Sequence, residues 1–205
     1  MQITIIPKKD LKLADDLQQQ ILNPTHKRRY RTFGCIHKNY NKEPSLFIGA
    51  YDKGKLIGIA FGFIKKSKIL LGEMAILENY RNKGIGQKLL SFFEKQAKKL
   101  NKKYIELGAW GSAEKFYLKN NYKPLIFVQI YHQDVPKNYK QLEFEIIKET
   151  NYADSKRLWI KTKYNPELKE ILKKKFNAYN VIYLEKNSEA EIIFNKSLLI
   201  SSAIK

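Results

Sequence analysis

The stretch LLGEMAILENYRNKGIGQKLL, residues 70–90, decides how the rest of the chain is interpreted. It begins as an apolar run typical of a β-strand and ends in a pattern with the period of a helix. A polar turn lies between them and contains Arg81, Asn82, Lys83, Gly84 and Gly86. Glycines let the backbone turn tightly, and the N–H groups and dipole of a helix N-terminus attract anions. The stretch therefore predicts a strand, a turn suited to phosphate or pyrophosphate, and a helix.

The composition bounds the kind of protein this can be. Hydrophobic residues make up 43% and aromatic residues 13% of the 205 residues, which favours a folded chain with a real core. The net charge of +19 favours anionic partners such as nucleic acid, an acidic protein or a polyphosphate cofactor. The lysines are scattered along the chain, so a compositional bias with a solvated surface is the alternative interpretation.

Cysteine usage and apolar runs indicate the compartment. A single cysteine, Cys35, excludes an internal disulfide framework and favours a reducing environment. The start, MQITIIP, does not have the charge and apolar pattern of a signal peptide. The longest apolar run, residues 56–64, is about half of what a membrane-spanning helix needs. We expect a soluble, cytoplasmic protein without membrane association.

The patterns on either side of the turn predict a mixed sheet. The expected strands up to this point are residues 3–6, 45–51, 56–65 and 69–77, and a helix is expected over residues 11–21. The DKGK sequence between the second and third strands is a hairpin signal, so three consecutive strands should be antiparallel. The helix after Gly86 leads to a strand at residues 103–107, which should be parallel to the strand before that helix.

The remaining chain predicts a second set of elements. They are a helix at residues 113–120, strands at 125–131 and 142–147, helices at about 152–162 and 166–176, and strands at 181–184 and 191–194. Residues 149–205 thus form a predicted C-terminal βααβ extension. Residues 3–10 and 144–151 share a weak similarity, which raises the alternative that the extension is a truncated second copy of the first part.

Two common phosphate-binding motifs do not fit the turn. The Rossmann pattern fails because Leu89 replaces its third glycine, and because antiparallel hairpins precede the turn. A P-loop fails because no Gly-Lys-Ser/Thr follows the glycines.

Residues 74–90 instead resemble the acetyl-CoA motif of the GCN5-related N-acetyltransferases (GNAT), Arg/Gln-x-x-Gly-x-Gly/Ala. Arg81, Gly84 and Gly86 match this motif. Residues 113–122, AEKFYLKNNY, are similar to the family's second motif, a short helix with Phe-Tyr before a strand. The resemblance covers roughly residues 1–148, and residues 149–205 follow as the extension.

The resemblance implies an α/β (α+β) fold, the acyl-CoA N-acyltransferase fold. This has a mixed, mostly antiparallel sheet, a splayed central pair of parallel strands, and helices on both faces. The chain departs from the family pattern at Glu78, where proline is frequent, and at Asn82, where glycine is frequent. It also has Trp110 where many members carry an asparagine near the cofactor arm.

The resemblance implies acetyl-CoA as co-substrate and no metal. Backbone groups of Met74 and Ile76 would pair with the pantetheine arm, and the turn would hold the pyrophosphate. The implied cofactor-binding residues are Met74, Ile76, Arg81, Asn82, Lys83, Gly84, Ile85, Gly86 and Gln87. For the side chains of Arg81 and Lys83, a solvent-facing position is the alternative.

The implied chemistry is direct attack of an amine on the thioester, with a general acid and a general base. Tyr117 matches the family's frequent general acid. Glu106 and Glu73 are the two candidate bases, and the choice stays open, as does the alternative that neither acts. Glu73 alternates with Ile69, Leu71 and Ala75, so we expect these four side chains to lie on one face of the strand. We expect burial on that face to raise the pKa of Glu73.

The function expected from the sequence is transfer of acetyl to a primary amine of unknown identity. The basic residues 27–31 hint at an acidic acceptor, such as a protein or a nucleic-acid-associated substrate. The alternative is a catalytically decayed module that binds nucleic acid or an acidic protein. The sequence does not decide whether the extension completes a dimer interface or covers the acceptor groove. The histidines, His26, His37 and His132, and Cys35 form no metal-binding spacing.

Overall fold

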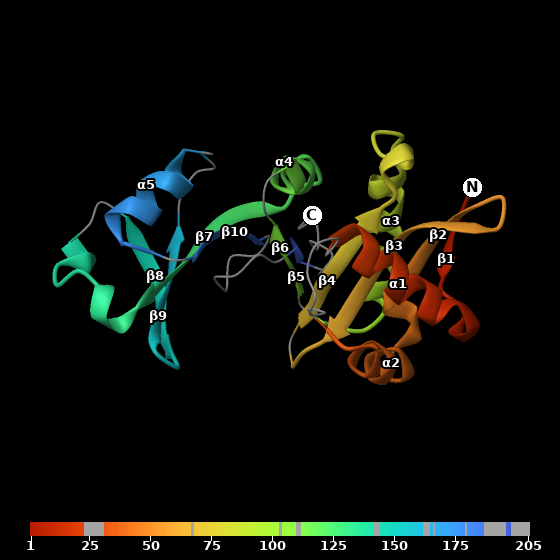
Figure 1. Cartoon of the computed structure of the whole chain (residues 1–205), viewed down its shortest axis with the longest axis horizontal. Helices are drawn as coiled ribbons and strands as arrows, with labels where there is room; N and C mark the ends of the chain where they lie inside the picture. The colour runs from red at the N-terminus through yellow and green to blue at the C-terminus, as the bar shows by residue number, and fades with distance from the viewer. Residues whose placement is uncertain are drawn as a thin grey trace, which may run out of the picture. The chain divides into compact units, whose positions relative to one another are not determined.

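The structure is a computed structural model of the chain (Figure 1). It describes residues 1–22, 31–66, 68–102, 104–109, 112–141, 144–161, 165, 167–178, 180–186 and 196–197. The described residues form two compact units, one within Met1–Ile105 and the other within Glu106–Ser197.

The first unit is built on antiparallel strands that follow one another along the chain. They are β1 (Gln2–Ile5), β2 (Phe47–Asp52), β3 (Lys55–Ile64) and β4 (Lys68–Ile76). The sheet order within this unit is β1-β2-β3-β4-β5, with β5 at Tyr104–Glu106; β11 (Lys196–Ser197) lies in the second unit's part of the chain. The pair β4 and β5 is parallel, as expected from the helical crossover between them. The predicted mixed, mostly antiparallel sheet with a parallel pair is confirmed.

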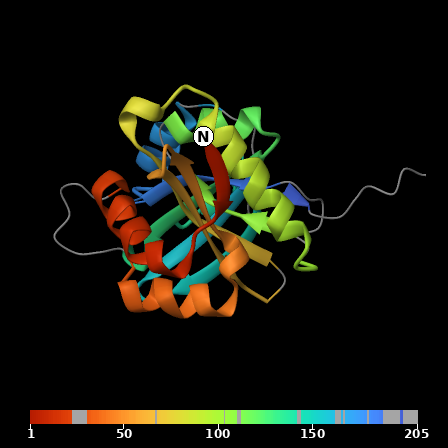
Figure 2. The same ribbon diagram turned by 90° about the vertical axis from the view of Figure 1, so that its right-hand side faces the viewer.

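Helices cover both faces of these strands. The helices are α1 (Leu11–Leu22), α2 (Phe33–Lys42) and α3 (Ile85–Lys98), with 3₁₀ turns η1 (Lys8–Asp10), η2 (Pro44–Leu46) and η3 (Glu78–Tyr80). Figure 2 shows α1 and α3 on opposite sides of the strands. Helix α2 follows the basic residues 27–31 and begins after Thr32, whose side chain accepts a hydrogen bond from the Cys35 N–H.

The face of the sheet against α3 is defined by close packing. The buried residues on α3 include Leu89, Leu90 and Phe93, which repeat with the helical period. A Cβ atom on Gly62 of β3 would lie 2.6 Å from the Phe93 ring. Gly62 therefore faces α3, and Phe61 and Phe63 face the opposite side of the sheet, because side chains alternate along a strand.

The second unit is an antiparallel sheet with two helices. Its elements are β6 (Gly108–Ala109), α4 (Ser112–Lys119), β7 (Lys123–Tyr131), η4 (His132–Asp134), η5 (Tyr139–Gln141), β8 (Glu145–Tyr152), β9 (Ser155–Lys161), α5 (Leu168–Lys175) and β10 (Asn180–Lys186). The sheet order is β6-β10-β7-β9-β8. Its core joins alternate residues of β7 and β9, such as Val128, Leu158 and Ile160, to Leu172 and Phe176 of the α5 region.

The predicted helix over residues 152–162 is wrong, because this segment forms the β8–β9 turn and strand β9. Leu158 and Ile160 lie in the core, while Trp159 between them stacks edge-on against Phe127. This is the period of a strand, and β9 pairs with β7 on one side and β8 on the other. Among the described residues of this segment, the predicted βααβ order is therefore corrected to the β8–β9 hairpin, helix α5 and strands β10 and β11.

The other predictions for this segment have mixed outcomes. The helix at residues 166–176 is confirmed as α5 and the strand at 181–184 as β10. The predicted strand at residues 191–194 lies outside the described residues. Strand β10 pairs with both β6 and β7, so the C-terminal segment supplies a central strand of this sheet. The boundary between residues 148 and 149, and the truncated second copy, stay predictions.

Within the described ranges, no helix combines the length and the apolar character that crossing a membrane requires.

Candidate active site

The turn between β4 and α3 has the backbone geometry of an anion site. Asn82 and Gly84 both adopt left-handed conformations, with φ values of 60° and 75°. Gly84 is the N-cap of α3, and no side chain caps the helix there. A Cβ atom on Gly84 would meet nothing within 4 Å, so glycine serves here for its φ angle. The first N–H groups of α3, beginning at Ile85, have no partner within the helix.

Two side chains of the turn, Arg81 and Lys83, contact neighbouring groups. Arg81 donates a hydrogen bond from Nε to the carbonyl oxygen of Ile76, at 3.1 Å, which ties the turn to the last residue of β4. The Lys83 ammonium lies 5.5 Å from the centre of the Tyr80 ring. Both Arg81 and Lys83 are exposed, so their charges add to the positive potential of the helix N-terminus. The turn can therefore hold an anion through backbone and side chains together.

Strand β4 contains a β-bulge at Gly72. Glu73 pairs with Phe61 of β3, and the next pair along is Leu71 with Gly62, so that Gly72 is skipped. Because Phe61 and Gly62 point to opposite faces, Glu73 and Leu71 also point to opposite faces. The expectation that Glu73 shares one face with Ile69, Leu71 and Ala75 is thus wrong for Ile69 and Leu71, although all four are buried.

Glu73 is buried on the face of β4 that lies opposite α3. Its residue exposure is 4%, and its Oε1 lies 3.1 Å from Nη1 of Arg31. Neither carboxylate oxygen accepts a hydrogen bond, so the contact with Arg31 is an ion pair without hydrogen-bond alignment. Burial raises the pKa of Glu73 to about 7, with Arg31 lowering it and Asp15 raising it further. A group that titrates near neutral pH can exchange a proton in either direction.

Met74 and Ile76 occupy the other face of the same strand. They pair with Ala60 and Gly58 of β3, and both side chains are half-buried. The carbonyl oxygen of Ile76 accepts the hydrogen bond from Arg81. The strand expected to run beside pantetheine is therefore tied by this hydrogen bond to the turn that follows η3.

Glu106 and Tyr117 belong to the second unit. Glu106 is the last residue of β5 and is half-buried. Tyr117 lies on α4 with 7% exposure, and its ring makes edge contacts with Phe116 and Tyr122. The structure places Glu73 and the turn within the first unit, and the assigned roles of all these residues stay predictions.

The sequence interpretation missed the polar cluster around Glu73. Asp15 and Gln18 lie one turn apart on α1 and are fully buried, and Arg31 is 16% exposed. A signal existed, because Asp15 and Gln18 interrupt the apolar stripe of Leu11 and Ala14. For Arg31, membership of the basic segment gave no indication that its side chain turns inward.

Some predicted features fall outside the described residues. They are Trp110, the histidine His26 and residues 27–30 of the basic segment. Among the residues that the structure describes, no group of three or more His, Cys, Asp or Glu side chains is placed to hold a metal ion. Cys35 is exposed.

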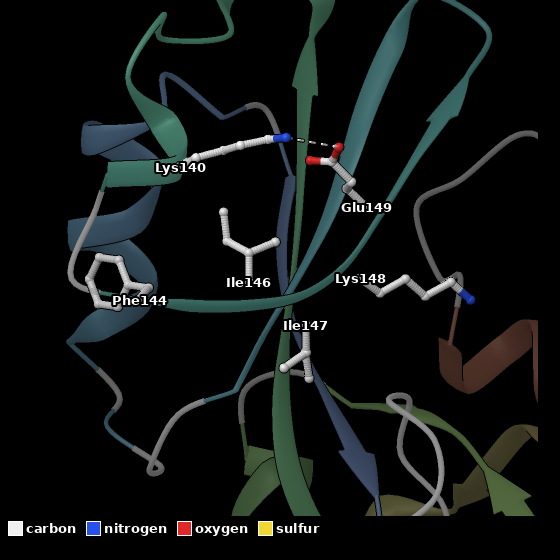
Figure 3. A pocket seen from close by; sticks show the side chains of 6 residues that line it. All are labelled: Lys140, Phe144, Ile146, Ile147, Lys148 and Glu149. Carbon is white, nitrogen blue, oxygen red and sulfur yellow. Dashed lines mark ion pairs between the residues drawn. The ribbon is translucent and has the colours of Figure 1, made fainter.

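The second unit has a surface pocket of about 400 Å³. Its lining residues are Lys140, Phe144, Ile146, Ile147, Lys148 and Glu149. Figure 3 shows Lys140 extending toward Glu149, with 3.7 Å between the charged atoms. Another pocket is lined by Tyr131, His132, Gln133 and Asp154. No predicted site residue lines either pocket. The candidate active site therefore consists of β4 and the turn that follows it.

The fold and the turn together define the class of this protein as an acyl-CoA N-acyltransferase fold. Residues 43–124, which include β4, the turn and α3, match the family model described as an acetyltransferase (GNAT) domain. The expected resemblance to the GNAT family is confirmed over these residues. A comparison with curated proteins gives no match.

Solved structures with a similar fold include several acetyltransferases. Ard1 from Thermoplasma volcanium is 17% identical with a TM-score of 0.53, over 80% of this chain and 98% of that one. A GNAT-family acetyltransferase from Staphylococcus aureus Mu50 is 18% identical with a TM-score of 0.51, over 78% and 97%. Diaminobutyrate acetyltransferase EctA from Paenibacillus lautus is 14% identical with a TM-score of 0.52, over 80% and 96%. At these identities the likeness establishes the fold.

Proposed function

We propose that this protein is an N-acetyltransferase that transfers acetyl from acetyl-CoA to a primary amine by direct attack. The observation that carries the proposal is the uncapped N-terminus of α3, preceded by left-handed Asn82 and Gly84, inside a GNAT domain. The EctA structure, which holds L-2,4-diaminobutyric acid and coenzyme A, supports a site for CoA and an amine on this fold.

The residues of the turn fit the pyrophosphate of coenzyme A. The first N–H groups of α3, at Ile85, Gly86 and Gln87, have no partner within the helix, so a dianion at this helix end gains both hydrogen bonds and dipole stabilisation. Arg81 and Lys83 bring positive charge to the same turn. Backbone groups of Met74 and Ile76 pair with the pantetheine arm in this proposal. Bound acetyl-CoA supplies the activated acetyl thioester.

Glu73 is the better supported of the two candidate bases. Its carboxylate accepts no hydrogen bond and its pKa of about 7 suits removal of a proton from an amine at neutral pH. Because Glu73 is buried, we propose that the proton reaches it through a water molecule. Glu106 stays the alternative base. Tyr117 is the proposed general acid, giving its phenolic proton to the departing thiolate.

Thermal stabilisation by acetyl-CoA tests the cofactor part of the proposal. A ligand at one hundred times its Kd raises the free energy of unfolding by about 2.7 kcal/mol, which shifts the Tm by several degrees. Gly84→Ala should abolish that shift, because alanine is strained at the left-handed φ of 75° and the turn relaxes away from its anion-binding conformation.

Gly54→Ala is the matched control. Gly54 also has a positive φ, 79°, with open space around its Cβ position, but it lies in the turn between β2 and β3. Both variants should lose about 1 kcal/mol of stability through backbone strain, and only Gly84→Ala should lose the acetyl-CoA shift. Absence of a shift in the native protein at saturating acetyl-CoA would overturn the proposal.

The acceptor is sought by thiol release from acetyl-CoA over a panel of amines, peptides and RNA-associated proteins. We expect the protein to act in the cytoplasm. The net charge of +19 supports the alternative, a binding module for nucleic acid or an acidic protein. Binding to RNA or DNA that weakens steeply with salt, without acetyl-CoA stabilisation, would favour that alternative.

A further inference from the structure

Arg31 is the charged residue that reaches the buried carboxylate of Glu73. It precedes Thr32, the N-cap of α2, and its side chain turns inward with 16% exposure. The guanidinium lies 4.5 Å from the centre of the Phe63 ring, and Nη1 lies 3.1 Å from Oε1 of Glu73. The ring and the carboxylate therefore fix the guanidinium from two sides, as a cation–π contact and an ion pair.

The bulge at Gly72 makes room for this arrangement. A Cβ atom on Gly72 would lie 2.4 Å from the Phe63 ring and 3.2 Å from Nη2 of Arg31. A side chain at this position would displace the ring or the guanidinium. The bulge also turns Glu73 to the face that Phe61 occupies. The bulge therefore both orients Glu73 and leaves space for the Arg31 guanidinium.

The charges around Glu73 oppose one another. Among the described residues, the charged groups that act on it are Arg31 and, from α1, Asp15. Strand β3 presents the apolar rings of Phe61 and Phe63 to this face. Burial and Asp15 favour the protonated carboxyl, and among the described residues the charge of Arg31 favours the carboxylate.

We propose that Arg31 is a positioning residue for the acetyl transfer: its guanidinium, braced on Phe63, keeps the buried Glu73 carboxylate charged and available as a proton acceptor. This inference rests on the proposed function for its catalytic meaning. The ion pair itself can be tested without turnover.

The pH profile of kcat/KM is the first test. Replacing Arg31 by methionine removes the charge and keeps much of the apolar stem, so the acid limb should move up by about one to three pH units. Arg31→Lys keeps the charge and should restore most of the native profile. Asp15→Asn removes a negative neighbour, so the acid limb should move down.

Arg157→Met is the matched control. Arg157 stacks on the Tyr152 ring at 3.6 Å in the second unit and has no role in the proposed site. It should leave the acid limb where it is in the native protein. If Arg31→Met leaves the acid limb unchanged, the proposal is overturned.

Carbon-13 NMR of glutamate carboxyl groups is the test that does not need an acceptor. The Glu73 resonance is assigned by its absence in Glu73→Gln, and its titration is followed in the native protein, Arg31→Met and Arg31→Lys. Should Arg31→Met fail to fold, the Glu73 titration in Arg31→Lys and Asp15→Asn still tests whether neighbouring charges set the pKa of Glu73.

The two failures are distinguishable. A titration that moves up in Arg31→Met supports the ion pair even if no amine releases thiol, in which case the proposed function alone fails. A titration that is the same in all variants overturns the role of Arg31, even if the protein acetylates an amine.

Discussion

Two glutamates in this molecule have similar neighbours, but their pKa values are shifted in opposite directions. Glu73 and Glu149 each lie beside a cation and an aromatic ring, yet the pKa of Glu73 is raised to about 7 and that of Glu149 is lowered. Glu149 accepts a hydrogen bond from the Tyr139 hydroxyl at 2.7 Å, and its side chain is 39% exposed. Glu73 accepts none and is buried. Hydrogen bonding and solvent, more than the presence of a cation, decide the charge state.

The comparison also separates a reactive carboxylate from a structural one. Lys140 and Lys156 lie 3.7 and 4.0 Å from Glu149, so its charge is neutralised twice at the surface. Such a group is stable as a carboxylate and has little tendency to take a proton. Glu73 has Arg31 alone against burial and Asp15, which leaves it near the midpoint of its titration at neutral pH.

The largest difference between replacing Glu73 and replacing Glu149 is expected in turnover. Glu73→Gln keeps the shape and removes the base, so kcat should fall by about 10²- to 10⁴-fold while acetyl-CoA still stabilises the protein. Glu149→Gln should leave kcat unchanged. Steady-state thiol release measures both variants. Equal kcat for Glu73→Gln and the native protein would remove Glu73 from the mechanism.

The next effect is on stability as a function of pH. The folded pKa of Glu73 lies above its ordinary value of 4.5, so the folded state binds the proton more tightly than the unfolded state. Relative to Glu73→Gln, the native protein should be stabilised below about pH 4.5 and lose this advantage as the pH rises to about 7. The change should be on the order of 3 kcal/mol.

Glu149 should behave with the opposite sign. Its folded pKa is lowered, so its contribution is present above the unfolded pKa and is lost as the pH falls through the folded pKa. Denaturant unfolding of the native protein, Glu73→Gln and Glu149→Gln over a pH series measures both. Parallel curves for the native protein and Glu73→Gln would contradict the assignment for Glu73.

The smallest effect is expected at Tyr139. Tyr139→Phe removes the hydroxyl that donates to Glu149, so the pKa of Glu149 should rise toward its ordinary value. The loss of stability should be at most about 1 kcal/mol, because the pair is partly exposed. NMR titration of the Glu149 carboxyl carbon gives the shift. An unchanged pKa would assign the lowering to the lysines in place of the hydroxyl.

Local signals in the sequence predict the strand, turn and helix at residues 70–90 and much of the fold. Left-handed Gly84 and the apolar periods of β4 and α3 are properties of neighbouring residues, so they can be read from a short segment. The β8–β9 turn has no such signal. Ala153 adopts a φ of 49° there without a glycine, and the segment was misread as a helix.

The environment of Glu73 depends on residues far apart in the chain. The sequence identified Glu73 as a candidate, but the bulge at Gly72 is a property of the β3–β4 pairing, and Arg31 meets Glu73 only in the folded unit. A sequence pattern can show that Asp15 interrupts an apolar helix face. It cannot show that the interruption lies opposite a buried glutamate.

The most direct test of the account is kcat/KM of the native protein for acetyl-CoA-dependent thiol release, measured from about pH 4 to 9 with the best acceptor amine. The account predicts a rate that rises with pH and bends near 7, the pKa of Glu73. An acid limb that bends near 4.5, the ordinary value for a glutamate, would contradict it.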